Sequence, residues 1–456
     1  MPDAAPIDTD HHRPRFHIRP ATGFVNDPNG PVLIDGVAHL YFQFRAPMHH
    51  PGAQVLWGHA TSEDLVRWTL HRPAISPHPV LGDREGAWSG NTVVREDGAV
   101  VAFYSGYRHE HPFQSVQAAV STDGGFSFGE PRQVVADPAP EEGVRQLRDP
   151  FVWREDGTWR MVVGAGDERR VGSTRLYRSE DLETWTFEGL RASAVRGAIA
   201  EVDTGDMWEC PQLVRLDGED VLLIASWSEE VGIGQVLSVR GLERRGASDE
   251  ELVVRRLDAG SNFYASSAMR ESPHGALVWG WVTEGRTDAA AETAGWSGTI
   301  SLPRVVRLGP DGSVLSAPVP AVDSLRQEEL SGTSGTEVGA QLEVLVALPD
   351  GVASARAVLA FSADERLVIE LDRDAGEVRI DRSEASVLEG SHGGVTRISA
   401  AFGDTAEVRL FLDGSVVETF TSGGRVATTR VYPAAPPPWR LEHDGTADVR
   451  LWRLGV

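Results

Sequence analysis

Short apolar runs of strand length recur along the whole chain, with glycine, aspartate and asparagine between them. Helical periodicity is nearly absent. Even the run VLLIASW, Val221 to Trp227, has the length of a buried strand and falls well short of a membrane span. The pattern therefore predicts an all-β protein.

The runs repeat with a period of about sixty residues. One set of landmarks is a serine-led turn, which starts at Ser62 (SEDLVRW), Ser121 (STDGGFSF), Ser179 (SEDLETW) and, in a weaker copy, Ser238 (SVRGLE). A second set, at nearly the same step, is a turn that feeds a short apolar strand, marked by Asp27, Trp88, Asp149, Glu209 and Phe263. A unit of this length, with several short strands and no means of burying its faces alone, is typical of a propeller blade. Five landmarks predict a five-bladed β-propeller over residues 1–310.

The pattern of apolar and polar residues changes after Arg304. The segment PAVDSLRQEEL, Pro320 to Leu330, predicts a short helix within a linker over residues 311–336. Alternating stretches such as ERLVIELD, GEVRIDRS and ADVRLWRL then predict a β-sandwich over residues 337–456. No carboxylate cluster stands out there, so we expect this domain to be structural or to contact carbohydrate.

The charge balance narrows the class of partner. Lys and Arg number 43 against 67 Asp and Glu, a formal net charge of −24, which repels nucleic acid and anionic membranes. The single cysteine, Cys210, excludes an intrachain disulfide framework and a cysteine-based zinc cluster. The first twenty residues do not form a secretory signal. We expect a soluble, cytoplasmic protein, and the sequence does not indicate its oligomeric state.

Three carboxylates of the repeat converge on one place. The inner strand of every propeller blade runs beside the central channel, so the starts of these strands meet in one funnel. Asp27, Asp149 and Glu209 hold equivalent positions in blades one, three and four. Singly, each suits a turn or a capping position. Together they repel one another, and proteins rarely keep such a cluster without a use for it.

The ordered motifs FVNDPNG, WGHATSEDLVRW, WSG, RDP, WEC and GWSGTISLPR, from Phe24 to Arg304, resemble the β-fructofuranosidases of glycoside hydrolase family 32. The later stretch LFLDGSVVETFTSGG, Leu410 to Gly424, is similar to that family's C-terminal sandwich signature. The resemblance implies a hydrolase that releases terminal β-fructosyl units from sucrose, fructo-oligosaccharides or fructans. It also implies retention of configuration through a fructosyl-enzyme intermediate.

Glycoside cleavage by two carboxyl groups needs one ionised group at the anomeric carbon and one proton donor. Asp27 lies beside Asn26 in a turn rich in backbone N–H groups, which predicts a lowered pKa and the role of nucleophile. Glu209 lies between Trp208 and Cys210, an apolar setting that favours the protonated acid. The resemblance implies the same two roles.

The third carboxylate is expected to bind the sugar. Arg148 beside Asp149 should hold that carboxylate ionised, as a bidentate acceptor for two hydroxyls, and the resemblance implies that it stabilises the transition state. Further predicted substrate contacts, some of them carried only by the resemblance, are Asn26, Gln43, Trp88, Ser89, Arg148, Tyr264 and Trp296. For Tyr264 and Trp296 a place in the core stays an alternative, since an aromatic residue at a strand start is often buried.

Two departures from the family's usual pattern concern the leaving-group side. Phe24-Val25 stands where a tryptophan is usual, and Pro51-Gly52 stands where Trp-Gly is usual. Losing aromatic stacking surface there predicts loose or redirected selectivity among leaving groups. We therefore expect an exo-acting enzyme that accepts sucrose and short fructo-oligosaccharides, with sucrose 6-phosphate as a further candidate if basic side chains line the rim.

No cofactor or metal is indicated, because no carboxylate–histidine spacing of a known metal site is present. We expect a surface position for His11, His12, His17, His49, His50, His109 and His111. Alternatives in function are a fructosyltransferase or difructose-anhydride-processing enzyme with the same intermediate, and a non-catalytic fructan-binding protein. A sialidase-like propeller fits less well, because the arginine triad that a carboxylated sugar requires is missing.

Overall fold

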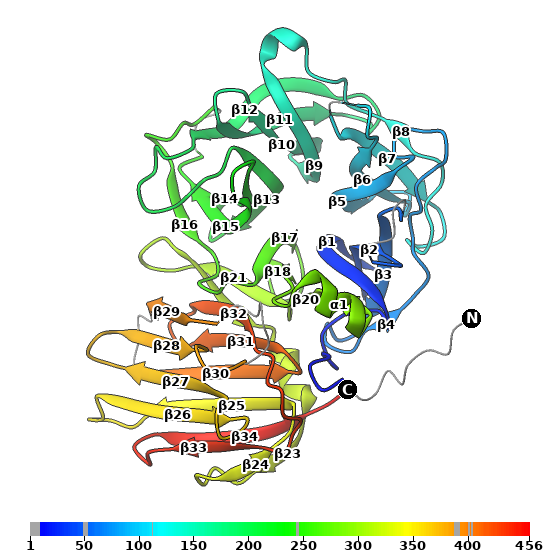
Figure 1. The fold of residues 1–456 in the computed structure, drawn as a ribbon. Coiled ribbons are helices and arrows are strands. Elements are labelled where there is room, and N and C mark those ends of the chain that lie inside the picture. The colour runs from blue at the N-terminus through cyan, green and yellow to red at the C-terminus, as the bar shows by residue number, and fades with distance from the viewer. Residues whose placement is uncertain are drawn as a thin grey trace.

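The computed structural model describes residues 10–48, 53–111, 113–242, 246–386, 393–399, 402 and 405–456. A ring of β-sheets stands beside a second body of two stacked β-sheets (Figure 1). The predicted all-β class, with a five-bladed propeller followed by a β-sandwich, is confirmed. The sequence predictions about His49, His50 and Pro51-Gly52 lie outside the described residues. No helix in the described part of the chain is long and apolar enough to cross a bilayer.

Each blade is an antiparallel sheet of four strands, numbered outward from the channel. Blade one consists of β1 (Gly23–Ile34), β2 (Val37–Arg45), β3 (Leu56–Ser62) and β4 (Thr69–Leu70). Blade two consists of β5 (Gly86–Val94), β6 (Val100–Tyr107), β7 (Ser115–Ser121) and β8 (Arg132–Gln133). Blade three follows the short 3-10 helix η1 (Pro140–Glu142) and consists of β9 (Val144–Glu155), β10 (Thr158–Asp167), β11 (Val171–Ser179) and β12 (Thr186–Val195).

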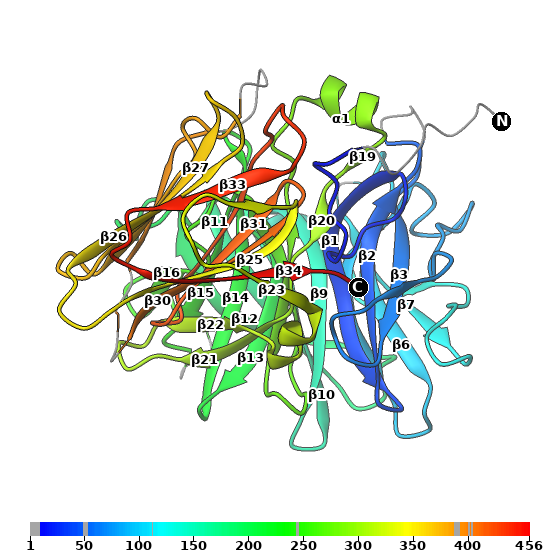
Figure 2. The ribbon, with the colours of Figure 1, turned by 90° about the horizontal axis from the view of Figure 1, so that it is seen from below.

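The last two blades complete the ring. Blade four consists of β13 (Met207–Leu216), β14 (Glu219–Ser228), β15 (Gly232–Arg240) and β16 (Val253–Arg256). Blade five consists of β17 (Phe263–Met269), β18 (Leu277–Val282), β21 (Arg304–Leu308) and β22 (Val314–Pro318). Between β18 and β21 lie α1 (Asp288–Ala294), β19 (Trp296–Ser297) and β20 (Thr299–Ile300). Strand β19 pairs in parallel with β1, which joins the last blade to the first, and α1 lies at that end of the ring (Figure 2).

The serine-led repeats are the turns that end the third strand of a blade. Ser62, Ser121 and Ser179 are the last residues of β3, β7 and β11. In the first of these turns, the Ser62 hydroxyl donates to Asp64, whose carboxylate accepts backbone N–H groups of Val66 and Arg67. Asp side chains favour such turns because they satisfy the backbone locally. The sequence period therefore reports one turn per blade.

The five inner strands share an irregularity on the side where they begin. The pairing register shifts at Asn26-Asp27 in β1, at Trp88-Ser89 in β5 and at Asp149 in β9. Corresponding shifts occur after Glu209 in β13 and after Tyr264 in β17. A β-bulge leaves residues unpaired and re-aims their side chains. The bulges thus point side chains from every blade toward one place.

The segment predicted as a linker with a helix is built differently. Residues 320–325 form a 3-10 helix, η2 (Pro320–Leu325), with Val322 and Leu325 buried. Residues 326–330 form β23 (Arg326–Leu330), so the predicted helix is wrong beyond Leu325. This polar strand pairs with β34 at the edge of a sheet, where Arg326 also forms an ion pair with the buried Glu343 at 2.7 Å. Strand β22 already pairs with β21 of blade five, so little of residues 311–336 is free linker.

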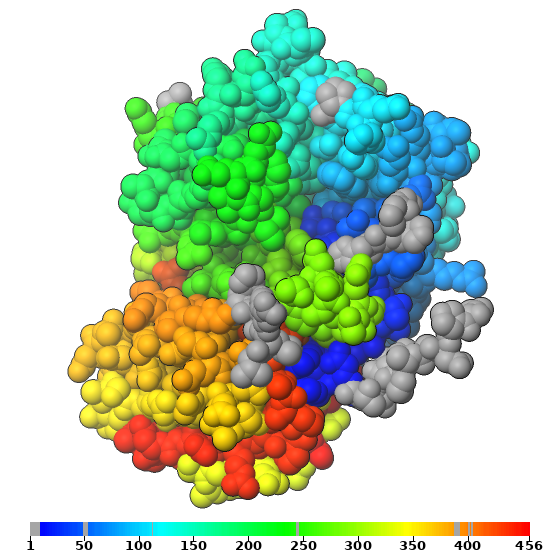
Figure 3. All heavy atoms as spheres, viewed as in Figure 1, coloured from blue at the N-terminus to red at the C-terminus, as the bar shows by residue number. Residues whose placement is uncertain are grey.

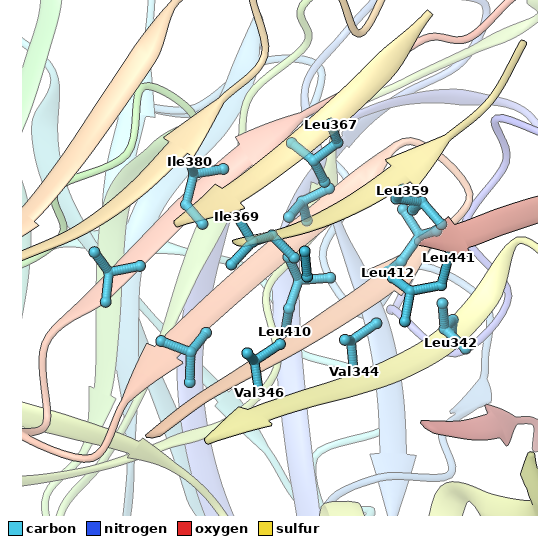
Figure 4. Close-up of a cluster of buried hydrophobic side chains, with 14 of the residues drawn as sticks. Leu342, Val344, Val346, Leu359, Leu367, Ile369, Ile380, Leu410, Leu412 and Leu441 are labelled. Carbon is cyan, nitrogen blue, oxygen red and sulfur yellow. The ribbon is translucent and has the colours of Figure 1, made fainter. Parts of the chain in front are cut away.

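The second body is a sandwich of two six-stranded sheets. One sheet consists of β23, β34 (Asp448–Leu454), β25 (Gln341–Leu348), β30 (Ala406–Asp413), β31 (Val416–Thr421) and β32 (Val426–Arg430). The other consists of β24 (Thr336–Val338), β33 (Trp439–His443), β26 (Ser354–Ala360), β27 (Arg366–Asp372), β28 (Glu377–Asp381) and β29 (Val395–Ser399). Alternate residues point inward, and Val344 and Val346 of β25 face Leu367 and Ile369 of β27 (Figure 4). This period-two burial is the pattern predicted from the sequence.

A buried charge cluster joins the sandwich to the propeller. Arg304 of β21 donates to Asp258 at 2.8 Å and to Glu418 of β31 at 2.6 Å. His17 lies between Asp413 at 2.8 Å and Glu418 at 3.0 Å, and its side chain is fully buried. We call these five residues the seam cluster. In the space-filling view, the dark-blue N-terminal segment lies against the sandwich at this seam (Figure 3).

The prediction that His17 lies on the surface is wrong. Asp413 accepts the backbone N–H groups of Arg15, Phe16 and His17, which draws the segment inward. Burial alone would lower the pKa of His17, but its hydrogen bonds to Asp413 and Glu418 raise that pKa to about 9. Among the other histidines of this set that the structure describes, His109 is exposed, and His11, His12 and His111 are partly buried.

The seam cluster predicts a pH dependence of stability. His17 gains protons more readily when folded, so its contribution is complete below about pH 6.5 and is lost as pH rises through about 9. We expect His17→Gln to reduce the free energy of unfolding by roughly 3 kcal/mol at neutral pH. In the variant, the free energy of unfolding should also fall much less between pH 7 and pH 9 than it does in the wild type. Denaturant titrations at several pH values measure both, with the exposed His274→Gln as control; equal slopes for all three proteins would contradict the expectation.

Candidate active site

A cavity of about 340 Å³ opens where the inner strands begin. Its lining residues come from all five blades: Asn26, Asp27, Gln43, Arg45, Ala53, Val55, Glu85, Trp88, Ser89, Tyr107, Arg148, Asp149, Glu209, Trp227, Ile233, Tyr264 and Trp281. Concave sites of this size with a few convergent polar groups commonly bind small ligands. The three carboxylates predicted to converge do so.

Asp27 lies in the bulge of β1 and is held by side chains from two blades. Its Oδ2 accepts hydrogen bonds from Ser89 Oγ at 2.5 Å and Gln43 Nε2 at 2.9 Å, and Oδ1 accepts one from Asn26 Nδ2 at 3.2 Å. Gln43 also donates to the Ser89 hydroxyl. These contacts fix the orientation of the carboxylate from one side.

The prediction of a lowered pKa for Asp27 is wrong. Burial raises that pKa to about 7, and the nearby charges of Asp149 and Glu209 act in the same direction. Ser89 and Cys210 oppose this rise by hydrogen bonding to the ionised form. The turn donors expected from the sequence are largely used elsewhere, because β1 continues through residues 23–34 as a paired strand.

Asp149 lies at a bulge of β9, where it has no partner in β10, and its φ is 64°. Its carboxylate accepts the Cys210 backbone N–H at 3.0 Å and the Ser105 hydroxyl at 3.2 Å. The Cys210 thiol lies 3.6 Å from both Asp149 Oδ2 and Asp27 Oδ2. Burial raises the pKa of Asp149 to about 6 even though Arg148 lowers it, with Glu209 adding to the rise. A single sulfur atom therefore separates two of the three carboxylates.

Arg148 pairs with Glu209, not with Asp149 as expected. Its Nη2 and Nε donate to Glu209 Oε1 at 2.7 and 3.0 Å. The reason is a register difference of one residue: the positive-φ bulge residue is Asp149 in β9 but Cys210 in β13. Glu209 therefore lies level with Arg148 and one residue before the position of Asp149. The apolar Trp208 side chain points away, into a core cluster that also contains Leu176.

Glu209 has a second contact, with a hydroxyl group that can donate a hydrogen bond to its carboxylate or accept one from its carboxylic acid. Its Oε2 lies 2.5 Å from the Tyr264 hydroxyl, and that hydroxyl lies 3.0 Å from the Ser226 carbonyl oxygen. A tyrosine hydroxyl carries one proton, and a carbonyl only accepts. When Tyr264 donates to Ser226, its oxygen can accept a hydrogen bond from the protonated carboxyl of Glu209; when Glu209 is ionised, Tyr264 donates a hydrogen bond to it instead. The pair thus accommodates both states of Glu209.

Most of the other predicted contacts also reach the cavity. Asn26, Gln43, Trp88 and Ser89 line it, and the Trp88 ring stacks on Tyr107 with centroids 4.4 Å apart. Trp296 is not among the lining residues. It is buried in β19, donates its indole N–H to Asp10 at 2.7 Å and lies under the guanidinium of Arg286. Its alternative place, in the core, is the one observed.

Sequence reasoning missed the residues at the ends of the second strands. Ser105 and Tyr107 of β6 correspond to Gln43 and Arg45 of β2, one blade earlier. Extending the sixty-residue period from the first strand to the second would have indicated them. Trp227 and Trp281, from the second strands of blades four and five, also line the cavity. Their apolar character gave no sign that they face a cavity and not the core.

Chemically, the site combines a buried carboxylate aligned by hydroxyl and amide donors with a second carboxyl group that can hold or release a proton. A third carboxylate, Asp149, faces the same space. Cleavage of a glycosidic bond by two carboxyl groups requires groups of this kind, and the third carboxylate is left to accept hydrogen bonds from sugar hydroxyls.

Comparison with known proteins agrees with this chemistry. The N-terminal domain of glycosyl hydrolases family 32 matches residues 17–318, and the C-terminal domain of the same family matches residues 319–452. A sucrose-6-phosphate hydrolase of Bacillus subtilis (strain 168) is 30% identical over 93% of this chain and 90% of its own length. A sucrose-6-phosphate hydrolase of Escherichia coli is 28% identical over 97% of this chain and 95% of its own.

A solved structure shares the whole fold. The sucrose-6-phosphate hydrolase from Lactobacillus gasseri superimposes with a TM-score of 0.82 at 24% identity, covering 98% of this chain and 94% of that one. With both family domains matched in order along nearly the full length, the chain belongs to glycoside hydrolase family 32.

Proposed function

We propose that this β-fructofuranosidase-type hydrolase cleaves terminal β-fructosyl units with Asp27 as nucleophile and Glu209 as general acid and base. The observation that carries the assignment is the meeting of Asp27, Asp149 and Glu209 in one cavity, each with different donors. Asp27 alone is gripped by the side chains of Ser89 and Gln43, so one of its oxygens is fixed while the other faces the substrate.

In the first step, ionised Asp27 attacks the anomeric carbon of the fructosyl unit. The bond to the leaving oxygen breaks, and Glu209 transfers its proton to that oxygen. Charge then shifts from Asp27 to Glu209, which Arg148 stabilises through two N–H donors. Arg148 is buried, but its hydrogen bonds to Glu209 and the nearby negative charge of Asp149 raise its pKa despite that burial, so it stays a cation throughout.

In the second step, Glu209 takes a proton from a water molecule, whose oxygen attacks the anomeric carbon and releases Asp27. Two displacements give fructose with retained configuration. Asp149 stays ionised and accepts the hydroxyls of the ring, and its contacts with Ser105 and the Cys210 N–H keep its orientation fixed. Burial and the nearby carboxylates raise the pKa of the Cys210 thiol well above its usual range, so it remains protonated between the two aspartates.

Hydrolysis is favoured over fructosyl transfer. The curated relatives include a raffinose invertase of Escherichia coli as well as sucrose-6-phosphate hydrolases. A purely carbohydrate-binding role is disfavoured by the complete set of three carboxylates with their donors. The preferred substrates are sucrose, sucrose 6-phosphate and short fructo-oligosaccharides, cleaved from the end. A cytoplasmic location, with a fructoside as substrate and neither nucleic acid nor a membrane as partner, completes the proposal.

Replacing the two reacting carboxylates should separate their roles. We expect Asp27→Asn to lower kcat by at least about 10⁴-fold on every fructoside, because no nucleophile remains. Glu209→Gln should lose about 10²- to 10⁴-fold on sucrose and much less on an aryl β-fructofuranoside whose phenolate leaves without protonation. Steady-state kinetics on both substrates measure this, with thermal melts to verify folding. Equal losses on the two substrates would refute Glu209 as the acid.

The acid limb of the pH–rate profile should lie at a higher pH than it would if the pKa of Asp27 were that of an aspartate in water. Asp27 must be ionised to attack, so kcat/KM should rise with pH until it passes about 7, the pKa that burial imposes. Removing the Ser89 hydroxyl removes a donor to the ionised form, so Ser89→Ala should move this limb to higher pH. Ser105→Ala, which removes hydrogen bonds to Asp149 and to the Ser89 carbonyl but none to Asp27, is the matched control. A limb below pH 5, or an unmoved limb in Ser89→Ala, would contradict the assignment.

Product analysis decides between hydrolysis and transfer and between exo and endo action. A panel of sucrose, sucrose 6-phosphate, inulin, levan and difructose anhydrides should give free fructose from the first time point. Accumulation of longer oligosaccharides at high sucrose would favour the transferase. Internal oligosaccharides released before fructose would refute exo action, and no cleavage of any substrate would favour the binding protein.

A further inference from the structure

Arg45 lies at the mouth of the cavity, on the strand that also carries Gln43. It is the last residue of β2 and pairs with Phe24, three residues before Asp27. Residues two apart on a strand share a face and lie roughly 7 Å apart along it. Gln43 contacts Asp27, and both Gln43 and Arg45 line the cavity. Arg45 therefore faces the space beyond the reacting carbon, on the side where a leaving group would lie.

The guanidinium of Arg45 has no ionic partner within the described residues. Its Nε is buried and makes no hydrogen bond there. The other arginine in the cavity, Arg148, is committed to Glu209. Glu85, the remaining charged residue at the rim, accepts the backbone N–H of His109. Partial burial lowers the pKa of Arg45, and no neighbouring carboxylate offsets this.

Aromatic rings hold this cation in place without using its N–H groups. The guanidinium carbon lies 5.3 Å from the centre of the Phe24 ring. Phe24 in turn meets Trp281 edge to face, with centroids 5.7 Å apart. A ring attracts the flat face of a guanidinium, while the N–H donors point outward along its edge. The side chain is therefore positioned with its terminal Nη groups available to a ligand, while its Nε stays buried.

The negative charge around the cavity bears on what kind of ligand an unpaired cation there would bind. The chain carries a net charge of −24, and four carboxylates line the cavity, those of Asp27, Asp149 and Glu209 inside it and that of Glu85 at its rim. Such a field repels an anionic substrate unless a local cation compensates. A guanidinium presents a planar fork of donors that matches a phosphate group. A neutral sugar would leave this positive charge unmatched.

We propose that Arg45 binds a phosphate group on the leaving sugar and so directs the enzyme to β-fructofuranosides with a phosphorylated leaving group. The inference rests on the proposed function, and it adds the residue that selects among substrates. Arg45 acts on binding and leaves the reacting atoms to Asp27 and Glu209.

The test compares sucrose with sucrose 6-phosphate in the wild type, Arg45→Gln, Arg45→Lys and a control, Arg132→Gln. Arg132 lies on β8 with its side chain 48% exposed, so its replacement makes the same change in net charge away from the cavity. The wild type should prefer sucrose 6-phosphate. In Arg45→Gln the ratio of kcat/KM for the two substrates should fall about ten- to a hundredfold, mainly through KM. Arg45→Lys should keep part of the preference, and Arg132→Gln all of it.

An unchanged ratio in Arg45→Gln, or a wild type that prefers sucrose, would overturn the inference while leaving the proposed function intact. Binding can be measured apart from catalysis in the Asp27→Asn background. There, calorimetry should give tighter binding of sucrose 6-phosphate than of sucrose, and adding Arg45→Gln should remove the difference. If the wild type cleaves neither sugar, the proposed function fails, and equal affinities in the calorimetry would then refute the phosphate site as well.

Discussion

Mutual repulsion among three carboxylates, one buried and two half-buried, is the constraint around which this structure is organised. Charges removed from water and placed together are costly unless donors compensate for the lost solvation. Each carboxylate therefore has its own set: Ser89 and Gln43 for Asp27, the Ser105 hydroxyl and the Cys210 N–H for Asp149, Arg148 and Tyr264 for Glu209. The difference between these sets gives three similar groups different surroundings, which suits the proposed roles of nucleophile, hydroxyl acceptor and proton donor.

The propeller supplies these donors because its repeat places corresponding residues of every blade at the same height along the central channel. A bulge at the start of each inner strand turns the unpaired residues toward the channel, and the second strand of the blade adds the residue beside them. Gln43 and Ser105 are such residues, and each acts on a carboxylate in its own blade or the next. A small offset has large chemical consequences here, since one residue of register places Glu209 opposite Arg148 and leaves Asp149 to a backbone N–H.

The sequence allowed the fold, the five-blade count and the three carboxylates to be predicted because these depend on periodicity, which a sequence displays directly. It failed where the outcome depended on which neighbour a side chain meets. The lowered pKa expected for Asp27 assumed that turn donors dominate, whereas burial does. Arg148 was expected to pair with Asp149 because they are adjacent in sequence, but the bulge at Asp149 gives that carboxylate other donors and leaves the guanidinium level with Glu209. His17 was expected on the surface because no local pattern announces a partner some four hundred residues away.

The motifs outside the cavity have a physical role that explains why a sandwich follows the propeller. Arg304 closes the SLPR motif, and Asp413 and Glu418 belong to the stretch LFLDGSVVETF; together they form most of the seam cluster. Asp413 grips the backbone of residues 15–17, and the same segment reaches Ile18, whose carbonyl accepts the N–H of Ile300. That segment leads directly into β1, the strand that carries Asp27. The sandwich therefore anchors the first blade at the point where the ring closes, beside the strand that carries the proposed nucleophile.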